Sequence, residues 1–205
     1  DSQRQQRLLE VWREQGKTSE VMNWLANQPQ TPAILQQRAE LLQSSGRGSD
    51  AGAAWERLYR QTGSLAALDQ ASYLLLKAGR GDTARGLLEQ AFDRHQGRLP
   101  ASLLQRLAGL YSQADAALDT RRISSLIPRV DAASRALLLA RLAESGNCAA
   151  VHAAIPAEPV EVGQLRALGR CAMPERPGEA VVYYQAAARL GDRGSRLPLA
   201  YALEA

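Results

Sequence analysis

The sequence predicts an all-α protein in which pairs of helices stack into a solenoid. Its 205 residues are 45% hydrophobic, and the apolar residues are mostly Ala and Leu, with a single Phe. Apolar and polar residues show no sustained alternation of the kind that marks a β-strand. A turn motif also recurs about every 33 residues, which is typical of repeats that contain two helices each.

Turn signals divide the chain into twelve short helices and the start of a thirteenth. Thr31 followed by Pro32 forms an N-cap with proline in the first helical turn, and Ser64 and Asp82 can cap the helices that follow them. Five glycines suit helix C-termini: Gly46, Gly63, Gly79, Gly97 and Gly146. The expected helices span 3–15, 19–27, 32–45, 49–62, 65–78, 82–95, 100–112, 115–126, 131–145, 147–154, 160–173 and 177–190, and another begins near Ser195.

The turn inside each pair sets the repeat. The turns centre on Gly46, Gly79, Ser112, Gly146 and Glu175, and the last interval is shorter than the others. Five residues later comes a small or compact apolar residue: Ala51, Ala84, Ala117, Val151 and Ala180. Four residues further on, most repeats have a bulky apolar side chain that can fill the space between pairs: Trp55, Leu88, Ile155 and Tyr184, with Arg121 as the exception. This order is similar to the tetratricopeptide repeat, whose pairs form a right-handed superhelix.

The repeats run through the chain without a boundary, so we expect one solenoid over residues 1–205. Residues 1–30 match the repeat poorly and are interpreted as an irregular first pair, while residues 31–205 hold about five repeats. The chain begins at Asp1 and stops inside the apolar pattern "LPLAYALEA", so we expect a fragment of a longer protein. No stretch approaches the ~20 apolar residues of a membrane helix, and no membrane insertion by this fragment is expected.

Charge and motif content argue against nucleic-acid binding and catalysis. The 25 basic residues are interspersed with 21 acidic ones rather than gathered into runs. The stretch "GRGDTARG" lacks the Lys-Ser/Thr of a phosphate-binding loop, and neither His95 nor His152 has an acidic or cysteine partner at helical spacing. We therefore expect no catalytic residues, no cofactor, no metal and no nucleic-acid partner.

Binding is the remaining possibility, and the first helix of each pair lines the concave face in solenoids of this type. Counting back from each turn places six polar or aromatic residues there: Gln36, Glu40, Gln43, Asp69, Tyr73 and Arg106. The equivalent positions in later repeats are apolar or small: Ala136, Ala140, Leu165 and Gly169. The sequence thus predicts a polar groove toward the N-terminus, with an ordinary hydrated surface as the alternative for each residue.

The chain has two cysteines, Cys148 and Cys171, for which three roles are possible. They are too few for a closed structural zinc site, and no Cys-x-x-Cys redox motif occurs. Cys148 opens a helix and Cys171 lies near the end of the next helix, which favours a disulfide between them. In the chain-entropy model, such a disulfide would stabilise the fold by ~3 kcal/mol. Two unrelated buried thiols remain the alternative. A disulfide would indicate an oxidising compartment.

The region around these cysteines resembles the periplasmic repeat region of the NfrA family of outer-membrane phage-adsorption proteins. The shared elements are an Asn-Cys helix start, a second Cys after a Leu-x-Arg step, and a helix with the spacing Pro-x-x-Ala-x-x-Tyr-x-x-Ala. They correspond to Asn147, Cys148, Leu168, Arg170, Cys171, Pro177, Ala180, Tyr183 and Ala186. The likeness runs from about residue 20 to the end and includes the step Leu68, Asp69 and Gln70.

The resemblance implies a periplasmic region of an outer-membrane protein that takes part in exopolysaccharide synthesis and export. Implied partners are an inner-membrane glycosyltransferase system, polysaccharide and a phage protein that uses the system for adsorption. Two rival interpretations stay open at this point. One is a superhelical accessory region of a peptidoglycan enzyme or of a cell-wall synthase activator. The other is a cytosolic repeat adaptor, which free thiols in the native protein would favour.

Overall fold

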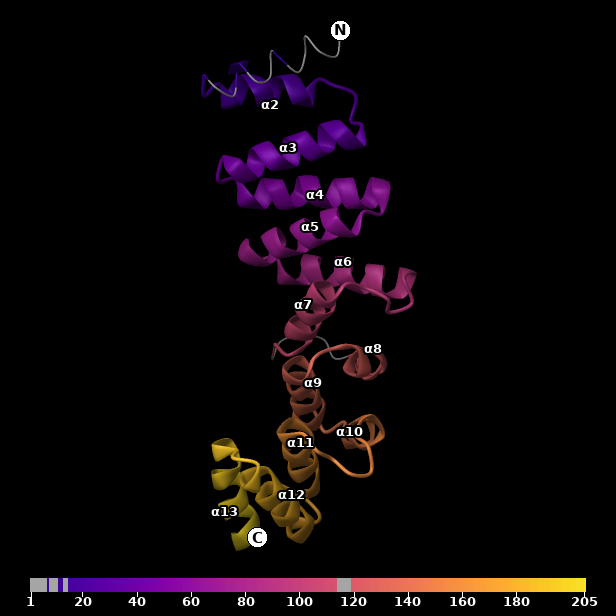
Figure 1. Cartoon of the computed structure of the whole chain (residues 1–205), viewed down its shortest axis with the longest axis vertical. Coiled ribbons are helices and arrows are strands. Elements are labelled where there is room, and N and C mark those ends of the chain that lie inside the picture. Colours follow the sequence, from indigo (N-terminus) through magenta and orange to yellow (C-terminus); the bar gives the residue numbers. More distant parts are fainter. Residues whose placement is uncertain (1–6, 8–10, 13–14, 114–118) are drawn as a thin grey trace. The chain divides into compact units, whose positions relative to one another are not determined.

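A computed structural model of the chain describes residues 7, 11–12, 15–113 and 119–205. These residues form twelve α-helices and two 3-10 helices and contain no strand, which confirms the all-α prediction (Figure 1). The expected helices at 3–15 and 115–126 lie partly outside the described residues. The helices are α2 Thr18–Ala26, α3 Pro32–Ser44, α4 Gly48–Thr62, α5 Leu65–Lys77, α6 Gly81–Arg94, α7 Ala101–Tyr111, α8 Thr120–Leu126, α9 Ala132–Glu144, α10 Cys148–Ala154, α11 Val162–Ala172, α12 Pro177–Arg189 and α13 Arg196–Glu204, with η1 at Ile127–Arg129 and η2 at Arg193–Ser195.

The chain divides into two compact units, Asp1–Ala91 and Phe92–Ala205, called here the N-terminal and the C-terminal unit. Each unit is built from helices that pack against the next helix in the sequence or the one after it. The single solenoid over residues 1–205 and its right-handed superhelix therefore stay predictions.

In the N-terminal unit, α3 packs on α4 and α4 packs on α5. Thr31 caps α3 by accepting from the Ile34 amide at 3.4 Å, and Ser64 caps α5 by accepting from the Ala67 amide at 3.4 Å, as the sequence predicts. Asp82 was predicted to cap the helix that follows it, but α6 begins one residue earlier, at Gly81. Its carboxylate lies in the first helical turn and pairs with Arg85.

The turns and the packing pattern follow the repeat. All five glycines expected at helix ends have a positive φ, between 71° and 76°, a conformation that side chains with a Cβ rarely adopt. The small residues at the described repeat positions are buried: Ala51, Ala84, Val151 and Ala180. The bulky residues after them are buried as well: Trp55, Leu88, Ile155 and Tyr184. Arg121 is exposed, and Ala117 lies outside the described residues.

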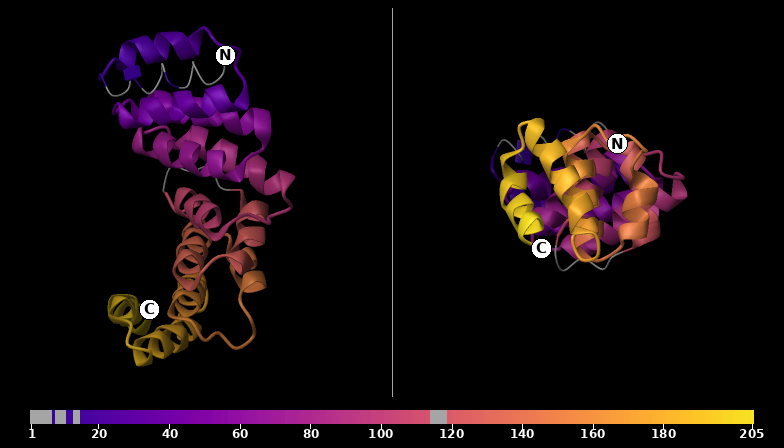
Figure 2. Two further views of the ribbon diagram at one scale, coloured as in Figure 1. Left: turned by 45° about the horizontal axis from the view of Figure 1, so that its top comes forward. Right: turned by 90° about the horizontal axis from the view of Figure 1, so that it is seen from below.

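In the C-terminal unit, the first helices of successive pairs pack side by side. Helix α7 contacts α9, α9 contacts α11, and α12 follows α11 and contacts α13 (Figure 2). The second helices α8 and α10 have only seven residues each, whereas α4 of the N-terminal unit has fifteen. Because α8 and α10 are so short, the long helices α9 and α11 provide much of the core, through residues such as Leu138, Leu139, Leu142 and Leu168.

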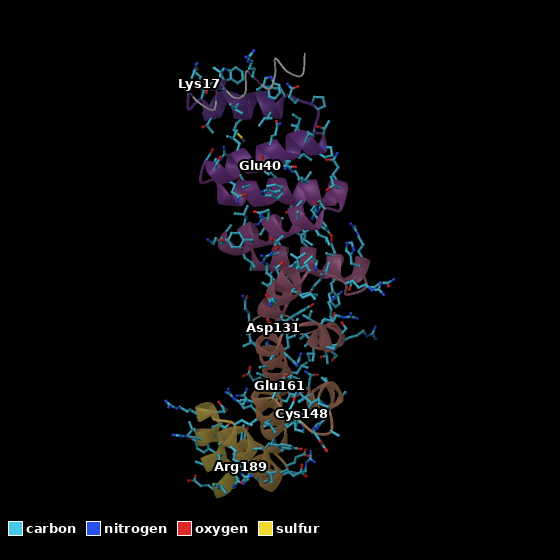
Figure 3. The ribbon with its side chains drawn as sticks, viewed as in Figure 1. Lys17, Glu40, Asp131, Cys148, Glu161 and Arg189 are labelled. Atoms are coloured by element: carbon cyan, nitrogen blue, oxygen red, sulfur yellow. A yellow bond between two sulfur atoms is a disulfide. The ribbon has the colours of Figure 1, made fainter. Side chains whose placement is uncertain are left out.

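Asp131 caps α9 and also links it to the preceding pair. Its carboxylate accepts from the Ser134 amide at 2.7 Å and from the side-chain amide of Gln105 on α7 (the position of Asp131 is labelled in Figure 3). The backbone hydrogen bond from Ser134 is the main cause that lowers the pKa of Asp131 below its ordinary value of 3.8. The carboxylate is therefore favoured in the folded state.

We expect the stability of the chain to depend on the charge of Asp131. A lowered pKa means that the carboxylate stabilises the fold fully above pH 3.8 and that this contribution is lost as the pH falls through the lower folded-state pKa. Asp131→Asn keeps a capping oxygen but removes the charge. In urea unfolding, wild type should exceed the variant in stability at pH 7, and the two should converge in acid. A difference that stays constant from pH 7 to pH 2 would contradict this explanation.

Candidate binding surfaces

The predicted residues on α3 are exposed, and each has a hydrogen-bond partner. The Gln36 side-chain amide donates to the Glu40 carboxylate at 2.9 Å. The Gln43 side-chain carbonyl accepts from the indole N–H of Trp55 at 3.2 Å, which ties it to α4. Glu40, labelled in Figure 3, lines a shallow pocket near the start of α2 that also includes Thr18 and Ser44. The structure thus brings Gln36 and Glu40 together beside a polar depression.

The remaining predicted residues are spread over both units. On α5, Asp69 is half-buried and Tyr73 is 42% exposed, with the Lys77 ammonium 4.9 Å from the centre of its ring. This cation–π contact orients both exposed side chains. Arg106 is half-buried on α7, in the C-terminal unit. The polar binding groove across these residues stays a prediction.

A second surface was not predicted and lies in the C-terminal unit. It is a groove of about 220 Å³ between α9 and α11 with contributions from α12 and α13, called here the α9–α11 groove. Four of its lining residues are small, and Leu137 of α9, which also lines it, has 51% of its surface exposed. The small lining residues are Ala136, Ala140, Gly163 and Ala167.

Two residues of α11 differ from their expected exposure. Leu165 and Gly169, expected on the concave face, are buried, whereas their neighbours Arg166 and Arg170 are exposed and line the groove. The ring of Tyr184 lies against Gly169, a contact that offsets counted back from a turn do not include. Ala136 and Ala140 of α9, also expected on the concave face, line the groove as well.

Two ion pairs hold α9 and α11 together. Arg135 near the start of α9 pairs with Glu161, which caps α11, and Glu144 at the end of α9 pairs with Arg170. Glu161 and Gln164 form a reciprocal capping box, in which the side chain of each residue accepts from the backbone amide of the other. These contacts join the two helices that line most of the groove.

The phenol of Tyr184 reaches the groove from α12. Its ring lies against Gly169, where a Cβ would approach the ring to 2.8 Å, so only glycine allows this contact without a shift. Burial raises the pKa of Tyr184, and the positive charges of Arg170 and Arg166 partly oppose this rise. Tyr184, Arg166 and Arg170 all belong to the lining of the groove.

The two cysteines form a disulfide, the pairing favoured from the sequence. Cys148 begins α10 and Cys171 lies near the end of α11, with the two Cα atoms 5.5 Å apart (Cys148 is labelled in Figure 3). Neither cysteine is free. The bridge attaches the seven-residue α10 to the long helix α11.

Metal clusters and membrane-spanning helices are absent from the part of the chain that the structure describes. Within residues 7, 11–12, 15–113 and 119–205, no group of three or more His, Cys, Asp or Glu side chains is arranged to hold a metal ion. Among the same residues, no helix combines the length and the apolar character needed to span a membrane.

The helix pairs, the glycine turns and the small-then-bulky packing define a tetratricopeptide-like helical repeat protein. A tetratricopeptide repeat protein from Parabacteroides merdae has 17% identity and a TM-score of 0.39, over 96% of this chain and 82% of that one. The tetratricopeptide domain of P58(IPK) has 15% identity and a TM-score of 0.42, over 98% of this chain and 64% of that one. No protein-family model and no curated protein matches the chain.

Proposed function

We propose that this chain is a non-catalytic scaffold that binds partner proteins in the periplasm. The observation that carries the proposal is the disulfide between Cys148 and Cys171 within a helical repeat fold. Disulfides persist in oxidising compartments, and reducing cytosols keep such pairs as thiols. The fold supports the binding role because paired helices present extended surfaces to partners.

We further propose that the parent protein is an NfrA-like outer-membrane protein and that this region serves exopolysaccharide synthesis and export. The resemblance rests on residues that have defined positions in the fold. Asn147 precedes α10, Cys171 lies near the end of α11, and Pro177 begins α12. An inner-membrane glycosyltransferase is the proposed protein partner. Polysaccharide and a phage adsorption protein are further proposed ligands of the same system.

The compartment is tested by counting thiols. The chain is exported to a bacterial periplasm, purified without reductant, denatured, and titrated with a thiol reagent. We expect no free thiol and a Cys148–Cys171 peptide by mass spectrometry. Two free thiols in the exported protein would contradict the periplasmic placement.

The partner is tested with purified components. The exported chain is immobilised and exposed to the detergent-solubilised glycosyltransferase of an NfrA-like exopolysaccharide system. Retention of the glycosyltransferase is expected, and a chain from an unrelated tetratricopeptide protein provides the control. Equal retention on both chains, or on neither, would remove the glycosyltransferase as a specific partner.

A further inference from the structure

We propose that the α9–α11 groove binds an extended segment of a partner protein in which an acidic side chain stands next to an aliphatic one. This inference rests on the proposed scaffold function and assigns it to one surface. The lining of the groove combines hydrogen-bond donors from two helices with apolar side chains. The polar lining residues are Arg166, Arg170, Tyr184 and Glu144, and the apolar ones include Leu137, Ala140 and Pro198.

Arg166 retains donors for a ligand. Its Nε lies 3.7 Å from a carboxylate oxygen of Asp192, which is an ion pair but too long for a hydrogen bond. The Asp192 carboxylate itself accepts from the Ser195 hydroxyl at 2.5 Å and from the Gly194 amide at 3.1 Å, so its oxygens are used to fold the turn before α13. The Arg166 side chain is 52% exposed. Its planar fork of N–H groups is therefore held at the groove and open to a new acceptor.

Arg170 and Tyr184 both lie next to Gly169 of α11. Arg170 hydrogen-bonds to Glu144 through one terminal nitrogen and remains 47% exposed. Tyr184 packs on Gly169, which directly precedes Arg170. Because Arg166 and Arg170 are four residues apart, they lie on one face of the helix. Arg166, Arg170 and Tyr184 all line the groove, so a ligand placed there meets two guanidinium groups and one phenol.

A carboxylate suits these donors best. Guanidinium groups bind carboxylates through paired, charge-assisted hydrogen bonds, which are stronger than bonds to neutral acceptors. Glu144 holds Arg170 in place and Asp192 holds Arg166 in place. Each arginine keeps N–H donors that its carboxylate partner does not use. The acidic residue of the ligand would therefore share the guanidinium groups with two fixed carboxylates.

The apolar lining residues of the groove suit an aliphatic side chain of a peptide. Leu137 is half exposed, and three alanines and one glycine, which have no polar side-chain atoms, also line the groove. Covering such a surface is favourable in proportion to the apolar area removed from water. A glycan would bring hydroxyl groups that find no polar partner among these residues. The volume of about 220 Å³ is below the ~300–1,000 Å³ of sites for drug-sized ligands, and it suits one or two side chains of a longer segment.

The experiment begins with a phage-displayed library of twelve-residue peptides, selected on the whole immobilised chain. Enriched peptides are then synthesised with blocked ends, and their dissociation constants are measured by fluorescence anisotropy. We expect Asp or Glu beside Leu, Ile or Val in the enriched peptides. Arg166→Gln and Arg170→Gln should each weaken binding roughly tenfold or more, as expected for the loss of a charged hydrogen bond. Leu137→Ser should weaken it several-fold.

Matched variants separate this groove from the rest of the chain. Arg121→Gln removes an exposed arginine of α8 that does not line the groove, and should leave affinity unchanged. Tyr184→Phe keeps the ring on Gly169 but removes the phenol, so binding should weaken while the thermal unfolding midpoint stays close to wild type. Circular dichroism confirms that each variant is folded.

The outcomes distinguish the groove from the scaffold function. If peptides bind the Arg166→Gln/Arg170→Gln double variant as tightly as wild type, the α9–α11 groove is not their binding site. The scaffold function would still hold in that case. A library that yields no binding peptide would contradict both. An alginate oligosaccharide serves as the anionic glycan probe. If it binds through Arg166 and Arg170 while no peptide does, the peptide assignment is wrong.

Discussion

Replacing both Cys148 and Cys171 by serine is expected to lower the free energy of unfolding by about 3 kcal/mol. The disulfide closes a segment of 23 residues, and its loss lets the unfolded chain sample many more conformations. Both residues are half-buried, so serine should fit without a large packing defect. Chemical denaturation followed by circular dichroism measures the difference.

The reduced wild-type protein is the matched control for this prediction. If the bridge alone causes the change, wild type in reductant should unfold at the same denaturant concentration as the double serine variant. The variant itself should not respond to reductant. A loss well below the expected value, or a variant less stable than the reduced wild type, would show that the chain entropy of the bridge is not the main cause.

The dependence on the disulfide follows from the weakness of α10. This helix has seven residues, and Val151 is its one buried residue. Isolated helices of this length are unstable in water. The chain after it runs through Pro156 and Pro159, neither of which can donate a backbone hydrogen bond. The covalent link to α11 therefore replaces part of the packing that a longer second helix would supply, as α4 does in the N-terminal unit.

Local signals in the sequence predicted most of the described helices and many of their ends. Glycine with a positive φ, and Ser or Thr before a helix, act through the backbone of a few neighbouring residues. Ser64 and Gly63 illustrate this, since one caps α5 and the other ends α4, as predicted. The predicted helix 147–154 also agrees with α10 within one residue. Such features do not require knowledge of the tertiary structure.

The α9–α11 groove could not be predicted because it depends on contacts between distant residues. Tyr184 packs on Gly169 of the preceding helix, and Gly163 lies against Ala136 of α9. Offsets counted back from a turn place a residue along its helix but do not show which side chain of a neighbouring helix covers it. A usable signal was the spacing of Arg166 and Arg170, which puts two arginines on one face of α11.

The exposed polar residues of α3 and α5 show a different limit of sequence reasoning. Gln36, Glu40 and Tyr73 are at the surface, as the helical pattern predicts. Exposure alone does not distinguish a binding surface from a hydrated one. The pattern identifies a face of a helix, whereas binding depends on which donors remain available after the fold has formed.

Replacing Gly163 by alanine is expected to destabilise the chain by about 2 kcal/mol. A Cβ at this position would lie 2.5 Å from the Cβ of Ala136 and 2.9 Å from its Cα. Neither atom can move by side-chain rotation, so α9 and α11 would have to separate. This shift would also strain the ion pairs of Arg135 with Glu161 and of Arg170 with Glu144. Urea unfolding of wild type and variant measures the loss.

Gly178→Ala provides a matched control, because Gly178 and Gly163 are both the second residue of their helices. No atom lies within 4 Å of a Cβ placed at Gly178, so alanine there should stabilise the chain by about 0.5 kcal/mol through the reduced entropy of the unfolded state. Adding Ala136→Gly to Gly163→Ala should restore part of the lost stability, since it removes the closer of the two contacts. The rescue should be incomplete because the Cα of residue 136 remains in the way. Purely additive effects of the two changes would mean that α9 and α11 are not in direct contact at this point, since substitutions at contacting residues couple.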